Sequence, residues 1–535
     1  MLKRILVVVL LVFAGVITFL LWPLKSKDFT INWDEEAIHD KRKFLESIPK
    51  ASPADSLPNI VLILADDLGM YDMSFYGGKN VETPYIDGIA RAGVAFDQGY
   101  VAAPMCSASR AAILTGRYPQ RFGFEFQMHD RYLKNRLEYL GFKFFISTDI
   151  WQPRPMDKVP LKKDIERQGL PPSEISIADL LKARGYATAL IGKWHTGSNP
   201  ANLPVSFGFD YQYGFFDAHS MYAPEGTKGI TDQRIKKDFT DQYNWKRGRK
   251  NTNGIFRNYE RIEEKEHLTE AITRESINFI RQQKDGPFFL FAAYNAPHTP
   301  LQAPDEYVKL YKDEPDPVKR VYYAMIKQLD ESIGRLLGEL ERLEILDNTL
   351  LIFLSDNGGA TYTYTTENGS LRGGKITDFE GGTRVPFFIS WPGKISAGSR
   401  FRHPVSAMDI YPTIAAAAGC PLPISRQIDG KDLQVYIHSD SIAPHNELFW
   451  QRGNTRAVRS GDWKVVWNAE FGDTLLFNIK DDPNETRDLF QLQKDLATDL
   501  IRIHDTWSAT LNKPLWPSVV HFREKVNGKW IYFDN

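Results

Sequence analysis

The sequence predicts an α/β protein: a large, mostly parallel sheet sandwiched by helices, then a smaller C-terminal antiparallel sheet with a helix. From residue 58 onward, apolar β-type runs alternate with helical patterns, as in folds built from strand–helix–strand units. The runs are nearly continuous in apolar residues, which is typical of strands covered on both faces. After residue 420 the runs become shorter and alternate between apolar and polar positions, which favours an antiparallel sheet.

The N-terminus carries a pattern that indicates export. Lys3 and Arg4 precede Ile5–Trp22, a run that is apolar except for Thr18. This run is long for a cleaved signal peptide and barely long enough to span a bilayer. We expect residues 1–24 to form a signal anchor, with a cleaved signal peptide as the alternative.

Four strands and three helices are the clearest elements of the main domain, which we predict to span residues 58–420. The expected strands are 59–64, 187–191, 288–293 and 349–354, and the expected helices are 177–184, 268–283 and 318–343. Residues 25–57 are polar and charged, so we expect a tether with a helix over 34–48. Residues 421–535 form the predicted C-terminal subdomain, in which a helix over 492–511 packs on the sheet.

The composition argues against general nucleic-acid binding and against a disulfide-stabilised fold. The chain has 66 basic and 67 acidic residues and a formal net charge of -1, so only local basic patches remain to consider. An exported chain of 535 residues with only Cys106 and Cys420 has no disulfide framework, which favours a bacterial periplasmic setting over secretion. A disulfide bond between these two cysteines remains an alternative.

Polar side chains follow all four predicted strands, at the edge where parallel sheets bind ligands. They are Asp66 and Asp67 after 59–64, Lys193 and His195 after 187–191, His298 after 288–293, and Asp356 and Asn357 after 349–354. Taken singly, turns, helix caps and ordinary loop residues explain each of these motifs. Adjacent carboxylates at the ends of two buried strands are costly without a cation, however. Their hard oxygens predict a site for Ca²⁺, or less strongly Mg²⁺.

A cysteine stands just before a predicted helix over 108–114. A helix N-terminus presents free N–H groups to anions, and Arg110, one turn in, adds a planar fork of donors. The Gly-rich segment 372–386 carries Lys375 as a further cation and lets the backbone approach a ligand closely. One interpretation is that Cys106 is a nucleophile aimed at a sulfate-like or phosphate-like group. The alternatives are a buried structural cysteine and a flexible surface loop.

These motifs together resemble the formylglycine-dependent (type I) sulfatases of the alkaline phosphatase superfamily. Cys-x-Ala-x-Arg at 106–110, with Leu-Thr-Gly-Arg at 114–117, is similar to their maturation signature. The resemblance continues, in order, through 64–69, 192–195, 296–298, 355–358, 373–382 and 476–485. Ala108 stands where most members have Pro, which leaves open which maturation enzyme acts. The resemblance implies an alkaline-phosphatase-like fold.

The resemblance also implies a mechanism. Cys106 would be oxidised after translation to formylglycine (3-oxoalanine), and the hydrate of this aldehyde would attack sulfur. Ca²⁺ would be bound by residue 106 together with Asp66, Asp67, Asp356 and Asn357. The remaining implied roles are sulfate binding by Lys193 and Lys375, orientation of the hydrate by Arg110, protonation of the leaving alcohol by His298, and proton removal by His195.

Two segments lie outside the matching motifs, at 127–163 and 220–265. Within the second, 227–250 has eight Lys or Arg residues against three Asp, interleaved with aromatic residues such as Tyr243 and Trp245. Such a run is usually a solvated face. In an exported sulfatase it suits a sulfated polysaccharide or oligosaccharide, such as a carrageenan. The alternatives are a phosphonate monoester or phosphodiester hydrolase on the same fold, and an inactive sulfated-glycan-binding relative.

Overall fold

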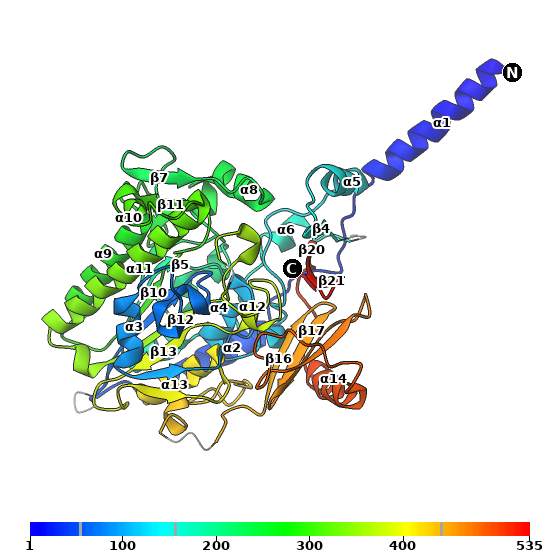
Figure 1. Cartoon of the computed structure of the whole chain (residues 1–535). Helices are drawn as coiled ribbons and strands as arrows, with labels where there is room; N and C mark the ends of the chain where they lie inside the picture. The colour runs from blue at the N-terminus through cyan, green and yellow to red at the C-terminus, as the bar shows by residue number, and fades with distance from the viewer. Residues whose placement is uncertain (53–55, 155–157, 367, 439–441) are drawn as a thin grey trace.

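The computed structural model describes residues 1–52, 56–154, 158–366, 368–438 and 442–535. At its centre is a ten-stranded sheet with the order β14-β2-β13-β12-β1-β10-β5-β6-β8-β9 (Figure 1). Five neighbouring strands are parallel, and they are β12 (Thr349–Ser355), β1 (Asn59–Ala65), β10 (Phe288–Ala293), β5 (Ala187–Lys193) and β6 (Tyr211–Phe215). The first four are the four strands predicted from the sequence, so the predicted fold class is confirmed.

The central strands are buried on both faces, which explains their continuous apolarity. In β1, Ile60, Leu62 and Leu64 join the hydrophobic cluster on one face of the sheet, while Val61 and Ile63 join the cluster on the other face. Successive side chains of a strand point to opposite faces, so a strand between two helical layers must be apolar at every position.

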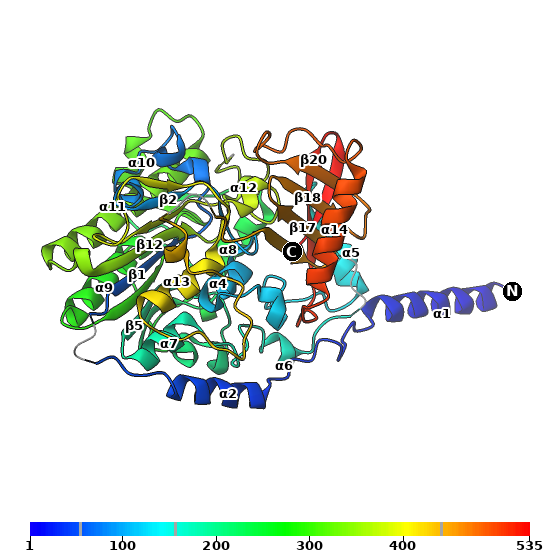
Figure 2. The same ribbon diagram turned by 90° about the horizontal axis from the view of Figure 1, so that it is seen from below.

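Helices cover both faces of this sheet (Figure 2). One layer contains α4 (Cys106–Thr115), α7 (Ile177–Arg184) and α13 (Ile410–Ala417). The other contains α3 (Pro84–Arg91), α9 (Leu268–Gln283) and α11 (Pro317–Arg342). The ends predicted for α7 and α9 agree with the structure, and α11 begins one residue earlier than predicted. The prediction for α4 was wrong at its start, because Cys106 is the first residue of the helix rather than a residue preceding it.

The sheet is extended at both edges by shorter strands. Beyond β12 lie β13 (Phe387–Ser390), which is antiparallel to β12, then β2 (Val94–Phe96), which is antiparallel to β13, and finally β14 (Ser399–Phe401). Beyond β6 lie β8 (Ile255–Arg257) and β9 (Glu260–Ile262). The segment 220–265 also supplies β7 (Ile230–Gln233), which pairs with β11 (Leu301–Pro304), and α8 (Phe239–Arg247).

The C-terminal region contains the predicted antiparallel sheet. Its strands are β16 (Glu447–Arg452), β17 (Thr455–Ser460), β18 (Trp463–Asn468) and β19 (Thr474–Asn478), and α14 (Lys494–Ser508) packs on it. A second small sheet was not predicted. In it, the hairpin of β20 (Val520–Val526) and β21 (Lys529–Asp534) pairs with β4 (Trp151–Pro153), so the segment 127–163 joins the C-terminus.

The N-terminal region has two parts. Helix α1 (Leu2–Leu21) extends away from the rest of the molecule, and its stretch Lys3–Leu21 is long and apolar enough to cross a membrane, with a mean hydropathy of 2.8 (Figure 1). A signal sequence would have the same properties. Helix α2 (Glu35–Glu46) instead lies on α7, where Lys41 pairs with Asp179 at 2.8 Å. The segment predicted as a tether therefore packs on the main domain over part of its length.

Candidate active site

The ends of β1 and β12 bring the predicted metal-binding residues together. The two strands pair in register up to Ala65 and Ser355, so the residues that follow lie side by side. The backbone N–H of Asp67 donates to Oδ1 of Asp356 at 3.3 Å, and the amide nitrogen of Asn357 donates to Oδ1 of Asp67 at 2.7 Å. Asp67 adopts a φ of +65°, a strained conformation for a non-glycine residue that recurs at functional sites.

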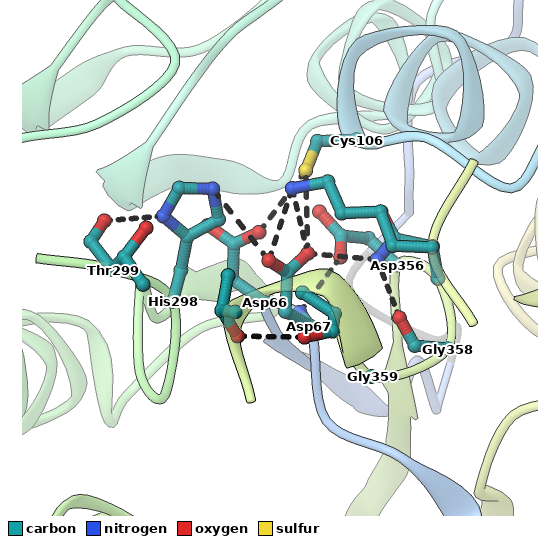
Figure 3. A network of polar contacts seen from close by, with 12 residues as sticks. Asp66, Asp67, Cys106, His298, Thr299, Asp356, Gly358 and Gly359 are labelled. Carbon is teal, nitrogen blue, oxygen red and sulfur yellow. Dashed lines mark hydrogen bonds and ion pairs between the residues drawn. The ribbon is translucent and has the colours of Figure 1, made fainter. Parts of the chain in front are cut away.

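Cys106 faces this group of carboxylates from the N-terminus of α4 (Figure 3). Its Sγ lies 3.2 Å from Oδ1 of Asp66 and 3.7 Å from Oδ1 of Asp67. Burial raises the pKa of the thiol well above its ordinary value, and the charges of Asp356 and Asp66 add to this effect. The side chain is therefore an uncharged thiol in this environment. Both cysteines are free and buried, so the alternative of a Cys106–Cys420 bridge is excluded.

Three cations surround the carboxylates. Arg110 donates through Nε to Oδ2 of Asp356 and through Nη1 to the carbonyl of Lys193, both at 2.8 Å. The ammonium group of Lys193 lies 2.6 Å from Oδ2 of Asp66, and that of Lys375 lies 3.0 Å from Oδ2 of Asp67. Each of the six ion-pairing side chains is almost completely buried. The site is thus a water-excluded array of alternating charges, in which each interaction is strong.

The electrostatic environment shifts the pKa values of two of the carboxyl groups in opposite directions. Burial acts to raise the pKa of Asp66, but the positive charges of Lys193 and Arg110, joined by His298 when it is protonated, outweigh it and hold that pKa well below its usual range. Burial raises the pKa of Asp356 to about 7, and repulsion from Asp66 contributes further. Without a further cation, the buried carboxylates therefore compete for the positive charge available.

The oxygen atoms at this site fit a hard divalent cation. Ligand atoms from Asp66, Asp67, Cys106 and His298 all lie within 4.8 Å of one another. Oδ1 of Asn357 is buried and has no hydrogen-bond partner within the described residues, although the nitrogen of the same amide is bonded. Buried polar atoms are normally satisfied, so this oxygen fits the role of a cation ligand. Carboxylate and amide oxygens are the donors that Ca²⁺ and Mg²⁺ prefer.

Two buried histidines lie near the same carboxylates. Nε2 of His298 lies 3.6 Å from Oδ2 of Asp67, while its Nδ1 contacts the carbonyl of Thr299. Burial, followed by the charge of Lys375, lowers the pKa of His298 to about 4. His195 follows Lys193 by two residues, adopts a φ of +54° and is buried. Burial and then Lys193 lower its pKa well below 6.5, so both imidazoles are neutral near pH 7 in this state.

Several residues that support the site were not predicted. The hydroxyl of Tyr222 donates to the carbonyls of Asn295 and His298, at 2.5 and 2.8 Å, and so holds the loop that carries His298. The amide of Gln127 lies 3.4 Å from Nε2 of His195. Tyr222 and Gln127 come from the two segments outside the matching motifs. Their contacts are long-range, and no local sequence pattern marks them.

The Lys375 loop is fixed by a buried side chain and by the C-terminal sheet. The amide nitrogen of Asn368 donates to the carbonyls of Gly359, Gly373 and Gly381 at 2.9–3.1 Å. At the far end of the loop, Lys464 of β18 lies 2.9 Å from Glu380 and 3.2 Å from Glu485. The C-terminal subdomain therefore holds the loop that delivers Lys375 to the site.

Comparisons with known proteins agree with this architecture. Residues 58–420 match the family described as Sulfatase. The N-acetylgalactosamine-6-sulfatase of Rattus norvegicus is 34% identical over 430 residues, which cover 78% of this chain and 73% of the relative. The steryl-sulfatase of Homo sapiens is 31% identical over 482 residues, which cover 78% of this chain and 77% of the relative.

Solved structures give the same result. The crystal structure of Ps i-CgsB has a TM-score of 0.72 and 33% sequence identity, and the match covers 86% of this chain and 95% of that one. The same protein in complex with k-i-k-neocarrahexaose has a TM-score of 0.71. Given the family match over most of the chain and the identity to these relatives, the chain belongs to the sulfatase family and is a sulfuric ester hydrolase.

Proposed function

We propose that this enzyme removes sulfate from a sulfated carbohydrate, using a formylglycine formed from Cys106 and a bound Ca²⁺. The observation that carries the proposal is the convergence of Asp66, Asp67, Asp356 and Asn357 on the side chain at position 106. A thiol that contacts two carboxylates is poorly placed to act as a thiolate, which is the nucleophilic form of cysteine. The same position suits an oxygen nucleophile beside a cation.

The bound groups would supply the difficult chemistry. Ca²⁺ would stabilise negative charge and acidify a bound hydroxyl, and the hydrated aldehyde would provide one hydroxyl to attack sulfur and another to release sulfate. The chain's own residues would hold the reacting groups. Arg110 is fixed by Asp356 and the Lys193 carbonyl, so it can orient the residue at 106, one helical turn away. Lys193 and Lys375 would neutralise the sulfate oxygens as charge develops.

Proton transfer would fall to the two histidines. The Nδ1 of His298 contacts a carbonyl oxygen and therefore carries a proton, which leaves Nε2 facing the site. Arrival of an anionic sulfate ester would favour protonation of Nε2, and this proton would pass to the leaving alcohol. His195, neutral beside Lys193, would accept a proton from the residue at position 106 when sulfate is released.

The substrate class is supported by the cationic segment 227–250. Strand β7 pairs with β11, which begins three residues after His298, and Asn244 of α8 lies 3.3 Å from the hydroxyl of Thr299. The segment thus borders the side of the site where a leaving group would lie. Its lysines, at 228, 236, 237, 246 and 250, are exposed, as a surface that meets a polyanion requires.

The aromatic residues of this segment are less available to a sugar substrate than the sequence predicted. Trp245 is buried beneath Arg234, whose guanidinium lies 4.0 Å from the centre of the indole ring, so it offers no face to a sugar. Tyr243 remains 44% exposed. The segment would therefore recognise a substrate mainly by charge. Relatives include a protein crystallised with neocarrahexaose and N-acetylgalactosamine-6-sulfatases, which supports a sulfated oligosaccharide such as a carrageenan fragment.

Mass spectrometry of the peptide that contains Cys106, purified from the native host, tests the nucleophile. We expect the mass of formylglycine at position 106 and loss of turnover in the Cys106→Ala variant. An unmodified thiol in a fully active enzyme would refute the proposed chemistry. The protein would also need a formylglycine-generating enzyme as a maturation partner.

Sulfate release from defined sulfated oligosaccharides, compared with nitrophenyl sulfate, tests the substrate. We expect turnover of at least one sulfated galactan oligosaccharide. Activity on the aryl ester alone would contradict the carbohydrate proposal, and faster turnover of phosphonate or phosphate diesters would favour the alternative reaction on the same fold.

The exposed lysines can be tested separately. In the double variant Lys236→Ala, Lys237→Ala, we expect KM for the oligosaccharide to rise by about 2–30-fold, because exposed ion pairs each contribute roughly 0.2–1 kcal/mol and two are lost. KM for nitrophenyl sulfate should stay unchanged. Lys284→Ala, a change next to the opposite end of β10, is the matched control and should alter neither value.

A further inference from the structure

Helix α5 (Arg136–Phe145) exposes large apolar side chains directly beside the base of α1. Phe144 is 69% exposed and Phe145 is 89% exposed, and Leu137 and Ile146 are each about half exposed. Leu137 and Phe144 are seven residues apart and therefore lie on the same face of the helix. A contiguous exposed apolar surface on a soluble domain usually marks an interaction site. The α5 apolar face is defined here as Leu137, Phe144 and Phe145.

The position of α5 relative to α1 is fixed by specific contacts. The guanidinium of Arg136 lies 4.4 Å from the centre of the Phe19 ring, in the last turn of α1. The backbone N–H of Leu24 donates to the carbonyl of Lys134 at 3.1 Å, and the N–H of Val159 donates to the carbonyl of Leu24. Both views show α5 at the inner end of α1 (Figures 1 and 2). The domain is therefore attached to the end of α1 without a long flexible link.

The residues at this end of α1 match those of a membrane surface. Trp22 is exposed where the apolar stretch ends, and tryptophan is enriched at the boundary between lipid and water. The cations Lys25, Lys27, Lys134 and Lys143 are exposed around the same region, as expected next to anionic headgroups. If α1 crosses a bilayer, its last turn lies at the boundary, and the contact with Phe19 brings α5 to the same depth.

We propose that α5 lies in the lipid headgroup region as a second membrane contact, with its apolar face inserted beside α1. An amphipathic helix in this position buries its apolar face at the boundary between headgroups and acyl chains and keeps its charged residues in water. The spanning helix would provide attachment, and α5 would fix the orientation of the catalytic domain relative to the membrane. This inference is independent of the substrate proposed above.

The test uses the full chain in vesicles of phosphatidylcholine and phosphatidylglycerol. An environment-sensitive fluorophore is attached at Phe145→Cys, and at Leu492→Cys as the control, since Leu492 is 77% exposed in the turn before α14. Cys106 and Cys420 are buried and should not react under native conditions. We expect blue-shifted emission and strong quenching by acyl-chain-brominated lipids for the label at position 145, and water-like emission without quenching for the label at position 492.

A second measurement separates insertion from other causes. With the label at Leu137→Cys, the substitutions Phe144→Ser and Phe145→Ser should reduce the blue shift, while turnover of nitrophenyl sulfate stays unchanged. The proposal is overturned if the chain fails to bind vesicles, or if the label at 145 reports water in bound protein. It is also overturned if energy transfer between chains labelled at 145 exceeds that at 492 in dilute vesicles, because a second copy would then cover the α5 apolar face.

Discussion

The amide of Asn357 uses its nitrogen but leaves its oxygen without a partner among the residues that the structure describes. If that oxygen is a Ca²⁺ ligand, the native protein should be stabilised by the ion, because a ligand that binds only the folded state adds about 2.7 kcal/mol at 100 times its Kd. We predict that Ca²⁺ raises the Tm of the chelated enzyme and that Asn357→Leu removes most of this increase.

The control for this prediction is Gln212→Leu. Gln212 is a buried amide on β6 whose side-chain atoms have no hydrogen-bond partner in the described ranges. This variant should keep the full increase in Tm with Ca²⁺. An equal increase in Asn357→Leu and wild type, measured by thermal denaturation with and without chelator, would contradict the proposed ligand set.

His298 offers a second test at the scale of one residue, based on the leaving group. A general acid contributes about 10²–10⁴ in rate when the leaving group needs a proton. In His298→Gln we therefore expect kcat on a sulfated sugar, whose leaving alcohol is strongly basic, to fall by about that factor. Nitrophenol leaves readily as an anion, so kcat on nitrophenyl sulfate should fall much less.

His219 provides the matched control for this experiment. It is buried near the site, and burial lowers its pKa to about 3, so without substrate it is neutral near pH 7, as His298 is. His219→Gln should lower kcat on both substrates by a similar factor, because it removes no proton donor to the leaving group. Equal losses on the two substrates in His298→Gln would show that its role is only structural.

At the scale of elements, β18 is tied to the catalytic loop through one buried ammonium group. Lys464 lies between Glu380 and Glu485, and all three side chains are fully buried. Removing the cation leaves two carboxylates buried together, and breaking a buried ion pair in this way costs about 3–5 kcal/mol. We predict that Lys464→Met lowers the free energy of unfolding by that amount, as measured by urea denaturation.

An exposed lysine of the same subdomain is the control for Lys464. Lys480 is 71% exposed and lies 3.6 Å from Asp462, and surface pairs of this kind contribute less than about 1 kcal/mol. Lys480→Met should therefore unfold at nearly the wild-type urea concentration. Two variants of equal stability would mean that the cluster of Lys464, Glu380 and Glu485 does not fix the loop.

At the scale of the whole molecule, the sequence predicted the parts that local chemistry determines. Continuous apolar runs identified β1, β5, β10 and β12, since strands buried on both faces admit few polar residues. The pairing of β4 with the C-terminal hairpin was missed, because β4 has only three residues and its partner lies more than 360 positions away. Register and contact between distant short strands depend on the assembled fold rather than on any local pattern.

The candidate site divides in the same way. The residues that end strands, such as Asp66 and Asp356, were predicted because parallel strands end along one edge of a sheet. Tyr222 and Asn368 were not, since they act through hydrogen bonds to backbone carbonyls that only the folded chain brings near. Asn368 begins an Asn-Gly-Ser sequence, yet it is only 1% exposed and its amide holds three loop carbonyls.

Acid should destabilise the whole molecule through its buried histidines. Burial lowers the pKa of His267 from 6.5 to about 4, and His129 and His504 are lowered in the same way. Between pH 6.5 and pH 4 the unfolded chain binds a proton at His267 that the folded chain does not. The folded state is therefore fully stable above pH 6.5 and loses stability as the pH falls towards 4. For His267 alone, the loss amounts to about 2 kcal/mol by about pH 5.

The variant His267→Gln tests how much the titration of this one histidine contributes to the loss of stability in acid. His267 contacts the carbonyl of Gln302 and stacks on Tyr222, so the variant should be less stable than wild type near neutral pH. Glutamine does not titrate, however, and the difference between the two proteins should therefore shrink as the pH falls from 6.5 to 5. Urea denaturation at a series of pH values measures this slope. A difference that stays constant with pH would mean that His267 titrates alike in the folded and unfolded chains, and that the acid sensitivity arises from other groups.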